Sequence, residues 1–157
     1  MSLFQEMYEI HLGSDLVADG TAEVLTTVED MSGFDDITFI VKLGDVDASA
    51  VLTFAVKENS ASSTSSPTPT AVTIDAVSAG ALTSGNLVAT ESSGNLDDKL
   101  IVITARKQAI SKQYVFLSIT ATVESFEIDS IITLKGRPRT LPVTQPSDVY
   151  SHCYAIG

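Results

Sequence analysis

The alternation of apolar and polar residues between Gln113 and Pro142 constrains the fold more than any other feature of this sequence. Before the polar pair Glu124-Ser125, one expected face carries Val115, Leu117, Ile119, Ala121 and Val123. After that pair, the expected apolar face carries Phe126, Ile128, Ile132 and Leu134. The opposite, mostly polar face then carries Glu127, Asp129, Thr133 and Lys135. A period of two is typical of half-buried strands, so the stretch predicts an antiparallel β-hairpin.

Two earlier runs show the same pattern. In residues 36–43 the apolar face consists of Ile37, Phe39, Val41 and Leu43, and in residues 50–57 it consists of Leu52, Phe54 and Val56. The short acidic turn between these runs predicts a second hairpin, with Asp45 and Asp47 at its tip. Residues 99–106 (KLIVITAR) are apolar on both faces, which predicts either a central strand or a strand that is buried on both sides.

Shorter strand candidates occupy residues 21–30, 71–77 and 86–91, so the chain contains about eight or nine strands separated by turn signals. Alternation of strands with amphipathic helices is not evident. The sequence therefore predicts an all-β fold, an antiparallel two-sheet sandwich with jelly-roll-like or Greek-key topology. We expect one domain over residues 1–157: an N-terminal arm or edge strand (1–30), the sandwich (31–144) and an extended C-terminal arm (145–157).

Composition limits the partners of the protein. The formal net charge of −11 argues against nucleic acid, because phosphate binding requires clustered Lys and Arg. A stretch of about 20 apolar residues is lacking, so we expect no membrane span. The single cysteine, Cys153, excludes an intrachain disulfide, and the first residues do not resemble a signal peptide. These features predict synthesis in a cytoplasm.

Candidate catalytic and metal-binding groups are sparse. His152 and Cys153 are adjacent, but a second pair at ligand spacing is missing and His11 lies far away in sequence. Asp45 and Asp47 lack the downstream glycine and glutamate of a calcium loop. The chain has no G-x-S-x-G elbow and no phosphate-binding glycine loop. We therefore expect no catalytic residues, no cofactor and no metal, and we predict that the protein is not an enzyme.

Four residues are candidate contacts to a partner. Arg137 and Arg139 form a basic group in an otherwise acidic chain, and they either flank a solvated turn or meet an acidic surface of another subunit. Tyr150 and Tyr154 lie in the C-terminal segment, where a core, an interface or a stacking role is open.

Several stretches resemble a known family. They are DITFIVKLGDVDASAVLTFAVKEN, VTIDAVSAGALTSGNLV, QYVFLSITATVES and IDSIITLKGRPRTLPVT. Between about Gly33 and Thr144 the chain resembles the capsid cement (decoration) proteins of tailed bacteriophages, in particular the family typified by the cement protein of a Bordetella podovirus. The most specific parts are the strand near Tyr114–Thr120 and the closing strand into Gly136-Arg137-Pro138.

The resemblance implies a jelly-roll structural protein on the outside of a phage head. Such a protein forms small homo-oligomers, either dimers or trimers, and spans neighbouring subunits of the major capsid protein. Two alternatives remain open at this point. One is a tail or head–tail connector component, and the other is a carbohydrate- or cell-surface-binding sandwich module, against which the absence of tryptophan argues.

Overall fold

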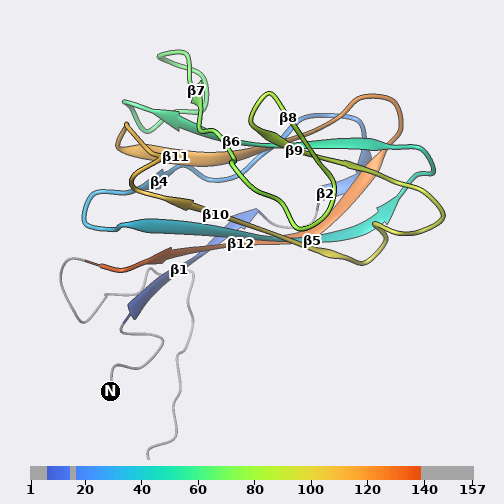
Figure 1. Ribbon diagram of the computed structural model, residues 1–157, viewed down its shortest axis with the longest axis horizontal. Helices are drawn as coiled ribbons and strands as arrows, with labels where there is room; N and C mark the ends of the chain where they lie inside the picture. The colour runs from blue at the N-terminus through green and yellow to red at the C-terminus, as the bar shows by residue number, and fades with distance from the viewer. Residues whose placement is uncertain (1–6, 15–16, 139–157) are drawn as a thin grey trace, which may run out of the picture.

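The computed structural model describes residues 7–14 and 17–138, which form two antiparallel sheets packed face to face (Figure 1). Sheet A contains β1 (Tyr8–Ser14), β2 (Val17–Gly20), β5 (Asp36–Val46), β10 (Leu100–Arg106) and β12 (Phe126–Gly136). Sheet B contains β3 (Val24–Leu25), β4 (Glu29–Asp30), β6 (Val51–Asn59), β7 (Thr70–Ala71), β8 (Ala81–Thr83), β9 (Asn86–Thr90) and β11 (Tyr114–Ala121). The predicted all-β two-sheet sandwich is therefore confirmed.

The strand order is that of a jelly roll. Sheet A runs β1-β12-β5-β10, and sheet B runs β3-β11-β6-β9-β8 with β4 also paired to β11. The antiparallel pairs are thus nested along the chain: β6 with β9, β5 with β10, β3 and β4 with β11, and β1 with β12. One long ribbon folded in this way wraps around a single core.

Both predicted hairpins are wrong. The strands β5 and β6 belong to opposite sheets, and so do β11 and β12. Each short polar connection crosses from one layer to the other instead of turning within a sheet. The alternation is the same in both cases, because a strand buries one face whether its successor lies beside it or across the core. Sequence periodicity alone does not separate these two arrangements.

The space between the sheets is filled by aliphatic side chains and phenylalanines. Phe39 and Phe126 come from sheet A and Phe54 comes from sheet B, and all three are at most 1% exposed. They belong to one continuous cluster of buried residues that draws on both sheets. At about 0.8 kcal/mol per buried CH₂ group, this cluster supplies the main stabilisation of the sandwich.

A bulge changes which face the end of β12 presents. Ile128 pairs with Leu43 of β5, and Ser130 pairs with the adjacent Lys42, so β12 carries one extra residue at this point. The inward positions shift accordingly. Thr133 and Lys135 point into the sandwich and are buried, whereas Ile132 is 39% exposed on the outer face. The expectation that Ile132 and Leu134 share the buried face with Phe126 is wrong for this reason.

Another expectation also needs correction. Among the described strands, β10 pairs only with β5 and forms an edge of sheet A, so it is not central. Its outer face is open, because Leu100 and Val102 are 61% and 60% exposed. The described part of the 1–30 segment, for which an arm or an edge strand was expected, contains β1 and β2 in sheet A and β3 and β4 in sheet B. The predicted C-terminal arm, residues 145–157, lies outside the described residues.

Candidate functional site

The outer face of sheet A carries a continuous row of aliphatic side chains. Leu12 of β1 is opposite Ile132 of β12, Ile132 is opposite Ile40 of β5, and Ile40 is opposite Val102 of β10. Directly opposed residues of antiparallel strands project from the same face. The four side chains therefore form one line across the sheet, which we call the aliphatic row.

Further aliphatic residues enlarge this row into a surface. Ile10 and Leu134 are opposed on one side of it, and Leu100 lies on the other side. Leu12, Leu100, Val102 and Ile132 are each more than one third exposed. We call the whole outer surface the aliphatic face; its members are Ile10, Leu12, Ile40, Leu100, Val102, Ile132 and Leu134. A contiguous apolar surface of this kind on a folded protein usually marks an interaction site.

Charged groups border the aliphatic face at both ends of the strands. At the end where β10 and β12 finish, Arg106, Lys107 and Arg137 surround a shallow notch of about 350 Å³ together with Asp35 and Gln108. We call this the basic notch. Three of the nine Lys and Arg residues of the chain thus lie around one notch, with Asp35 beside them and Asp36 paired to Arg137.

The opposite end of the strands is acidic. The Nζ of Lys42 lies 2.7 Å from Oδ1 of Asp98 and 3.0 Å from Oδ2 of Asp129. The hydrogen bond to Asp98, followed by that to Asp129, raises the pKa of Lys42, and the bond from Lys42 lowers the pKa of Asp98. Asp97 also lies here and accepts a hydrogen bond from the Val46 amide. Carboxylates outnumber cations, so this end is opposite in sign to the basic notch.

The four residues predicted as partner contacts are only partly placed. Arg137 follows β12, adopts a positive φ of 48°, and donates a hydrogen bond from Nε to Oδ2 of Asp36 at 2.7 Å. Its side chain is 57% exposed, so it is accessible at the rim of the aliphatic face. Arg139, Tyr150 and Tyr154 lie outside the described residues, as do His152 and Cys153.

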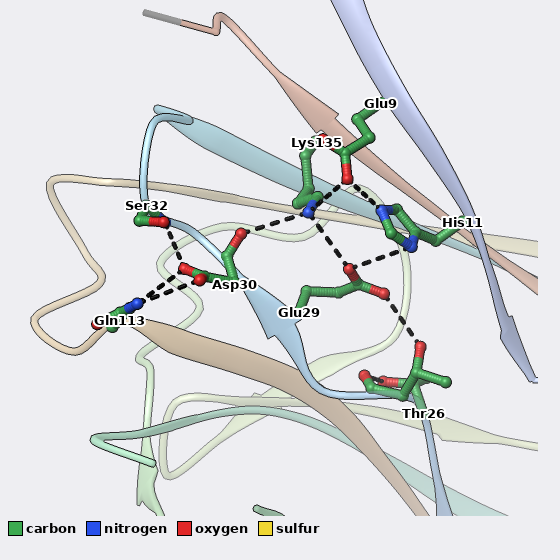
Figure 2. Close-up of polar contacts among 9 residues, drawn as sticks. Glu9, His11, Thr26, Glu29, Asp30, Ser32, Gln113 and Lys135 are labelled. Carbon is green, nitrogen blue, oxygen red and sulfur yellow. Dashed lines mark hydrogen bonds and ion pairs between the residues drawn. The ribbon is translucent and has the colours of Figure 1, made fainter. Parts of the chain in front are cut away.

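A buried ionic cluster holds the N-terminal strand inside the sandwich (Figure 2). The Nζ of Lys135 lies 2.9 Å from Oε1 of Glu9 and 3.6 Å from Oε2 of Glu29, and it donates a hydrogen bond to the Asp30 carbonyl at 3.3 Å. The imidazole of His11 lies between the same two glutamates, at 2.5 Å and 3.6 Å. Lys135 and Glu29 are almost fully buried, so each depends on the other for charge compensation.

This cluster connects strands of the two sheets, and its charged groups are mostly buried. Glu9 and His11 come from β1, Glu29 from β4 and Lys135 from β12, so the contacts connect the edge of sheet A to sheet B. The ammonium of Lys135 occupies the position between the two glutamates, and it also lies 4.9 Å from the centre of the Phe34 ring. Among the residues that the structure describes, no group of three or more His, Cys, Asp or Glu is arranged to hold a metal ion.

Two other buried carboxylates fix loops. Glu58 accepts hydrogen bonds from the Ser111 amide and hydroxyl, the Lys112 amide and the Thr70 hydroxyl. Burial raises the pKa of Glu58, but these hydrogen bonds together outweigh burial and lower that pKa below its ordinary value. Glu91 accepts hydrogen bonds from three consecutive amides, those of Gly94, Asn95 and Leu96. Both glutamates serve as loop anchors.

A groove of about 640 Å³ runs beside the free edge of β10. Its walls are β10 residues such as Ile103 and Ala105 and the extended segment that contains Val72 and Ile74. The described residues contribute no aromatic ring to this groove, although a carbohydrate-binding module would be expected to have one. Within the described ranges, no helix is long and apolar enough to cross a membrane.

The comparison with known protein families finds no match to this chain, and the search of curated proteins finds no significant relative. The candidate site therefore rests on the geometry of the described residues. Sequence reasoning missed the aliphatic face because it assigned every apolar position of a strand to the core. A usable signal was present: Leu100-Ile101-Val102-Ile103 and Ile131-Ile132 place apolar residues on both faces of their strands.

Proposed function

We propose that this protein is a virion structural protein of a tailed bacteriophage, a capsid cement protein made in the host cytoplasm and bound to the outside of the head. In this role it stabilises contacts between neighbouring major capsid protein subunits, without enzymatic activity and without a cofactor. The resemblance of residues from about Gly33 to Thr144 to cement proteins suggests the assignment.

The structural observation that carries the proposal is the aliphatic face. A two-sheet sandwich normally covers its outer strand positions with polar residues. Here four strands present aliphatic side chains outward in register, bordered by charges. A rigid jelly roll with such a surface is suited to binding other protein surfaces, which is the task of a cement protein. Arg137 at the rim, with Arg139, Tyr150 and Tyr154 further along the chain, supplies candidate contacts to the capsid.

Co-sedimentation with phage heads tests this function. Purified protein is mixed with expanded heads of its parent phage that have been stripped of this component. We expect saturable binding at a fixed ratio to the major capsid protein and an increased resistance of the heads to heat. Binding to tails instead would support a tail or head–tail connector component. Binding only to host polysaccharide would support a cell-surface-binding module, and either result would overturn the proposal.

Two variants locate the contacts. A chain that ends at Gln145 keeps all the described strands, so we expect it to fold and to lose attachment to heads. Arg137→Glu reverses the accessible charge beside Asp36 and should weaken attachment by about tenfold or more if Arg137 meets a capsid carboxylate. Lys57→Glu, a charge reversal on sheet B, the layer opposite the one that carries the aliphatic face, is the matched control. Unchanged attachment of the truncated chain would show that the C-terminal segment is dispensable.

A further inference from the structure

The strand β10 presents an open edge of sheet A. Among the described strands it pairs with β5 alone. The Lys107 amide donates a hydrogen bond to the Asp35 carbonyl at 2.7 Å, so the odd-numbered residues of β10 direct their backbone groups toward β5. The N–H and C=O groups of Leu100, Val102 and Thr104 point the other way, toward the open edge. This edge is therefore able to accept one more antiparallel strand.

A continuous groove follows this edge along the length of β10. The groove of about 640 Å³ and a second hollow of about 340 Å³ share Ile74 and Ile103, and the segment 72–79 forms the wall opposite β10. The groove is lined by buried core residues of both sheets: Val56, Leu87, Ile103 and Ala105. An added strand would bury its inward side chains against these residues while its backbone pairs with β10.

The chain leaves sheet A at the same end as β10. Gly136 of β12 is opposite Asp36 of β5, and Asp36 is opposite Arg106 at the end of β10. Both β10 and β12 are antiparallel to β5, so a segment that turns back here and follows the open edge is antiparallel to β10. The path past β5 and β10 covers three strand spacings, about 14 Å. Residues 139–147 span up to about 30 Å when extended, which is more than enough.

We propose that residues 148–155 of the same chain occupy this groove as one more antiparallel strand, paired with the open edge of β10. These residues belong to the part of the chain that the structure does not describe, and their sequence, DVYSHCYA, suits the site. From Val149 to Ala155, the small residues Val, Ser, Cys and Ala alternate with the rings of Tyr, His and Tyr. The three prolines that follow Gly136 all come before Ser147, where they do not interrupt strand pairing.

Charge selects the occupant and its register. Arg106 is exposed and forms no ion pair within the described part of the chain, because the nearby Asp36 is paired with Arg137. Asp148 is the single acidic residue between Arg139 and the last residue of the sequence, and opposite Arg106 it forms a cross-strand ion pair. A segment of the same chain is also present at an effective concentration of roughly millimolar order, so it binds ahead of a separate peptide.

This register divides the segment into two faces. The even-numbered residues exchange hydrogen bonds with the groups that β10 leaves open, and they point outward. Tyr150 then lies beside Thr104 and Tyr154 beside Leu100, so both tyrosines extend the rim of the aliphatic face and stay accessible as candidate contacts. The odd-numbered residues point into the groove, and Cys153 lies opposite Ile101. The docked segment thus covers an edge that would otherwise pair with other proteins.

Thiol labelling of the native full-length chain tests the docked segment, because Cys153 is its single cysteine. We expect Cys153 to react with a maleimide about tenfold or more slowly in the native chain than in the urea-unfolded chain, since it faces the groove. In a Cys153→Ser background, Tyr154→Cys moves the thiol to the outward face and should react severalfold faster. Equal rates for the two native chains, whether fast or slow, would overturn the proposal.

Disulfide trapping tests the register and the identity of the strand. Ile101→Cys is directly opposite Cys153 in a non-hydrogen-bonded pair, where Cα atoms lie about 4.5 Å apart, a distance that a disulfide spans. Mild oxidation should therefore link the two residues within one chain, as detected by peptide mass spectrometry of the monomeric fraction. Thr53→Cys, on the outer face of sheet B, is the control and should stay unlinked to Cys153. A disulfide between two chains, or none in the folded Ile101→Cys variant, would contradict the proposal.

A charge exchange tests the pairing of Arg106 with Asp148. Arg106→Asp and Asp148→Arg should each raise the labelling rate of Cys153 severalfold, because each places like charges opposite one another. The double variant restores opposite charges and should recover most of the protection, whereas an additive increase would rule out this register. None of these measurements uses phage heads, so the docked strand and the cement function are tested separately.

Discussion

The two outer faces of this sandwich differ in chemistry although their strands are built alike. On sheet A, the row from Leu12 to Val102 is aliphatic across four strands. On sheet B, the corresponding rows mix apolar and polar residues: Leu25, Ser118 and Ala55 form one, and Thr120, Thr53 and Val88 form another. The outer face of sheet B thus mixes polar and apolar residues, and the centre of the outer face of sheet A is aliphatic.

Polar contacts hold the outer face of sheet B together. Oε1 of Glu23 accepts a hydrogen bond from the Ser118 hydroxyl at 2.5 Å and lies 3.1 Å from Nζ of Lys57. The hydrogen bond from Ser118 is the main cause that lowers the pKa of Glu23, and Lys57 contributes in the same direction against a smaller effect of burial. The outer centre of sheet A contains no comparable bonded charge. The polar contact there among the described residues is the 2.9 Å hydrogen bond between the hydroxyls of Thr38 and Thr104, which are both neutral.

The largest expected effect tests which way the side chains at the end of β12 point. Lys135→Met leaves Glu9 and Glu29 without their cation inside the sandwich, and we expect a loss of about 3–5 kcal/mol in the free energy of unfolding. Leu134→Thr, at the next position on the outer face, should cost less than about 1 kcal/mol. Urea denaturation measures both. A larger loss for the leucine variant would show that the bulge does not exchange the faces.

The Lys135 prediction has an internal control. Lys135→Met combined with Glu29→Gln removes one of the two uncompensated charges, so the double variant should be more stable than the sum of the single effects predicts. Additive losses would show that the ionic pair is not coupled in the folded protein.

The second-largest expected effect compares the loss of stability at a buried residue on the outer side of sheet B with that at an exposed residue on the outer side of sheet A. Phe116 points to the outer side of sheet B but is completely buried, whereas Val102 on the outer side of sheet A is 60% exposed. Phe116→Ala should cost about 3 kcal/mol because it leaves a cavity. Val102→Ala should change monomer stability by less than about 0.5 kcal/mol. Thermal unfolding at low protein concentration compares the two variants.

The smallest expected effect is the pH dependence of stability that Glu23, on the outer face of sheet B, contributes. The pKa of Glu23 in the folded protein lies below its ordinary value of 4.5, so the stabilisation is complete above that pH and is lost as the pH falls through the folded pKa. Glu23→Gln should lower stability near neutral pH by less than about 1 kcal/mol, since the side chain is partly exposed. It should also make the loss of stability below pH 4.5 shallower, as measured by unfolding at several pH values.

Local periodicity predicted the long strands well, whereas only Ala71 of the predicted strand 71–77 lies in a strand. The runs 36–43, 50–57, 99–106 and 115–123 all contain strands, because burying one face of a strand requires alternation whatever the topology. Which strands are neighbours was not predictable in the same way. The nested pairing of β5 with β10 and of β1 with β12 depends on contacts between residues far apart in sequence. Alternation carries no information about such contacts.

The candidate site was less predictable for a specific reason. A single extra residue near Asp129 reverses the faces of β12, and β12 itself has no glycine or proline there. The glycine at this irregularity is Gly44 of the paired strand β5, which faces Asp129. That extra residue is the reason why Lys135 lies in the interior and Ile132 lies on the surface. Arg137 was recognised because its positive charge is unusual in an acidic chain. This signal comes from composition, so it does not depend on knowing the register of the strands.

The pairing of β1 with β12 has a consequence for how the protein folds. Tyr8 pairs with Gly136, so the sheet edge that contains the N-terminal strand closes only after nearly the whole described chain has been synthesised. Sheets with such long-range contacts fold slowly, because distant segments must be brought together before their contacts stabilise them. Before β12 has paired, Glu9 and Glu29 have no ammonium group between them. Their carboxylates are then more stable in water than in the interior. Only a chain translated through β12 is therefore able to pair its first strand and to place Lys135 between the two glutamates.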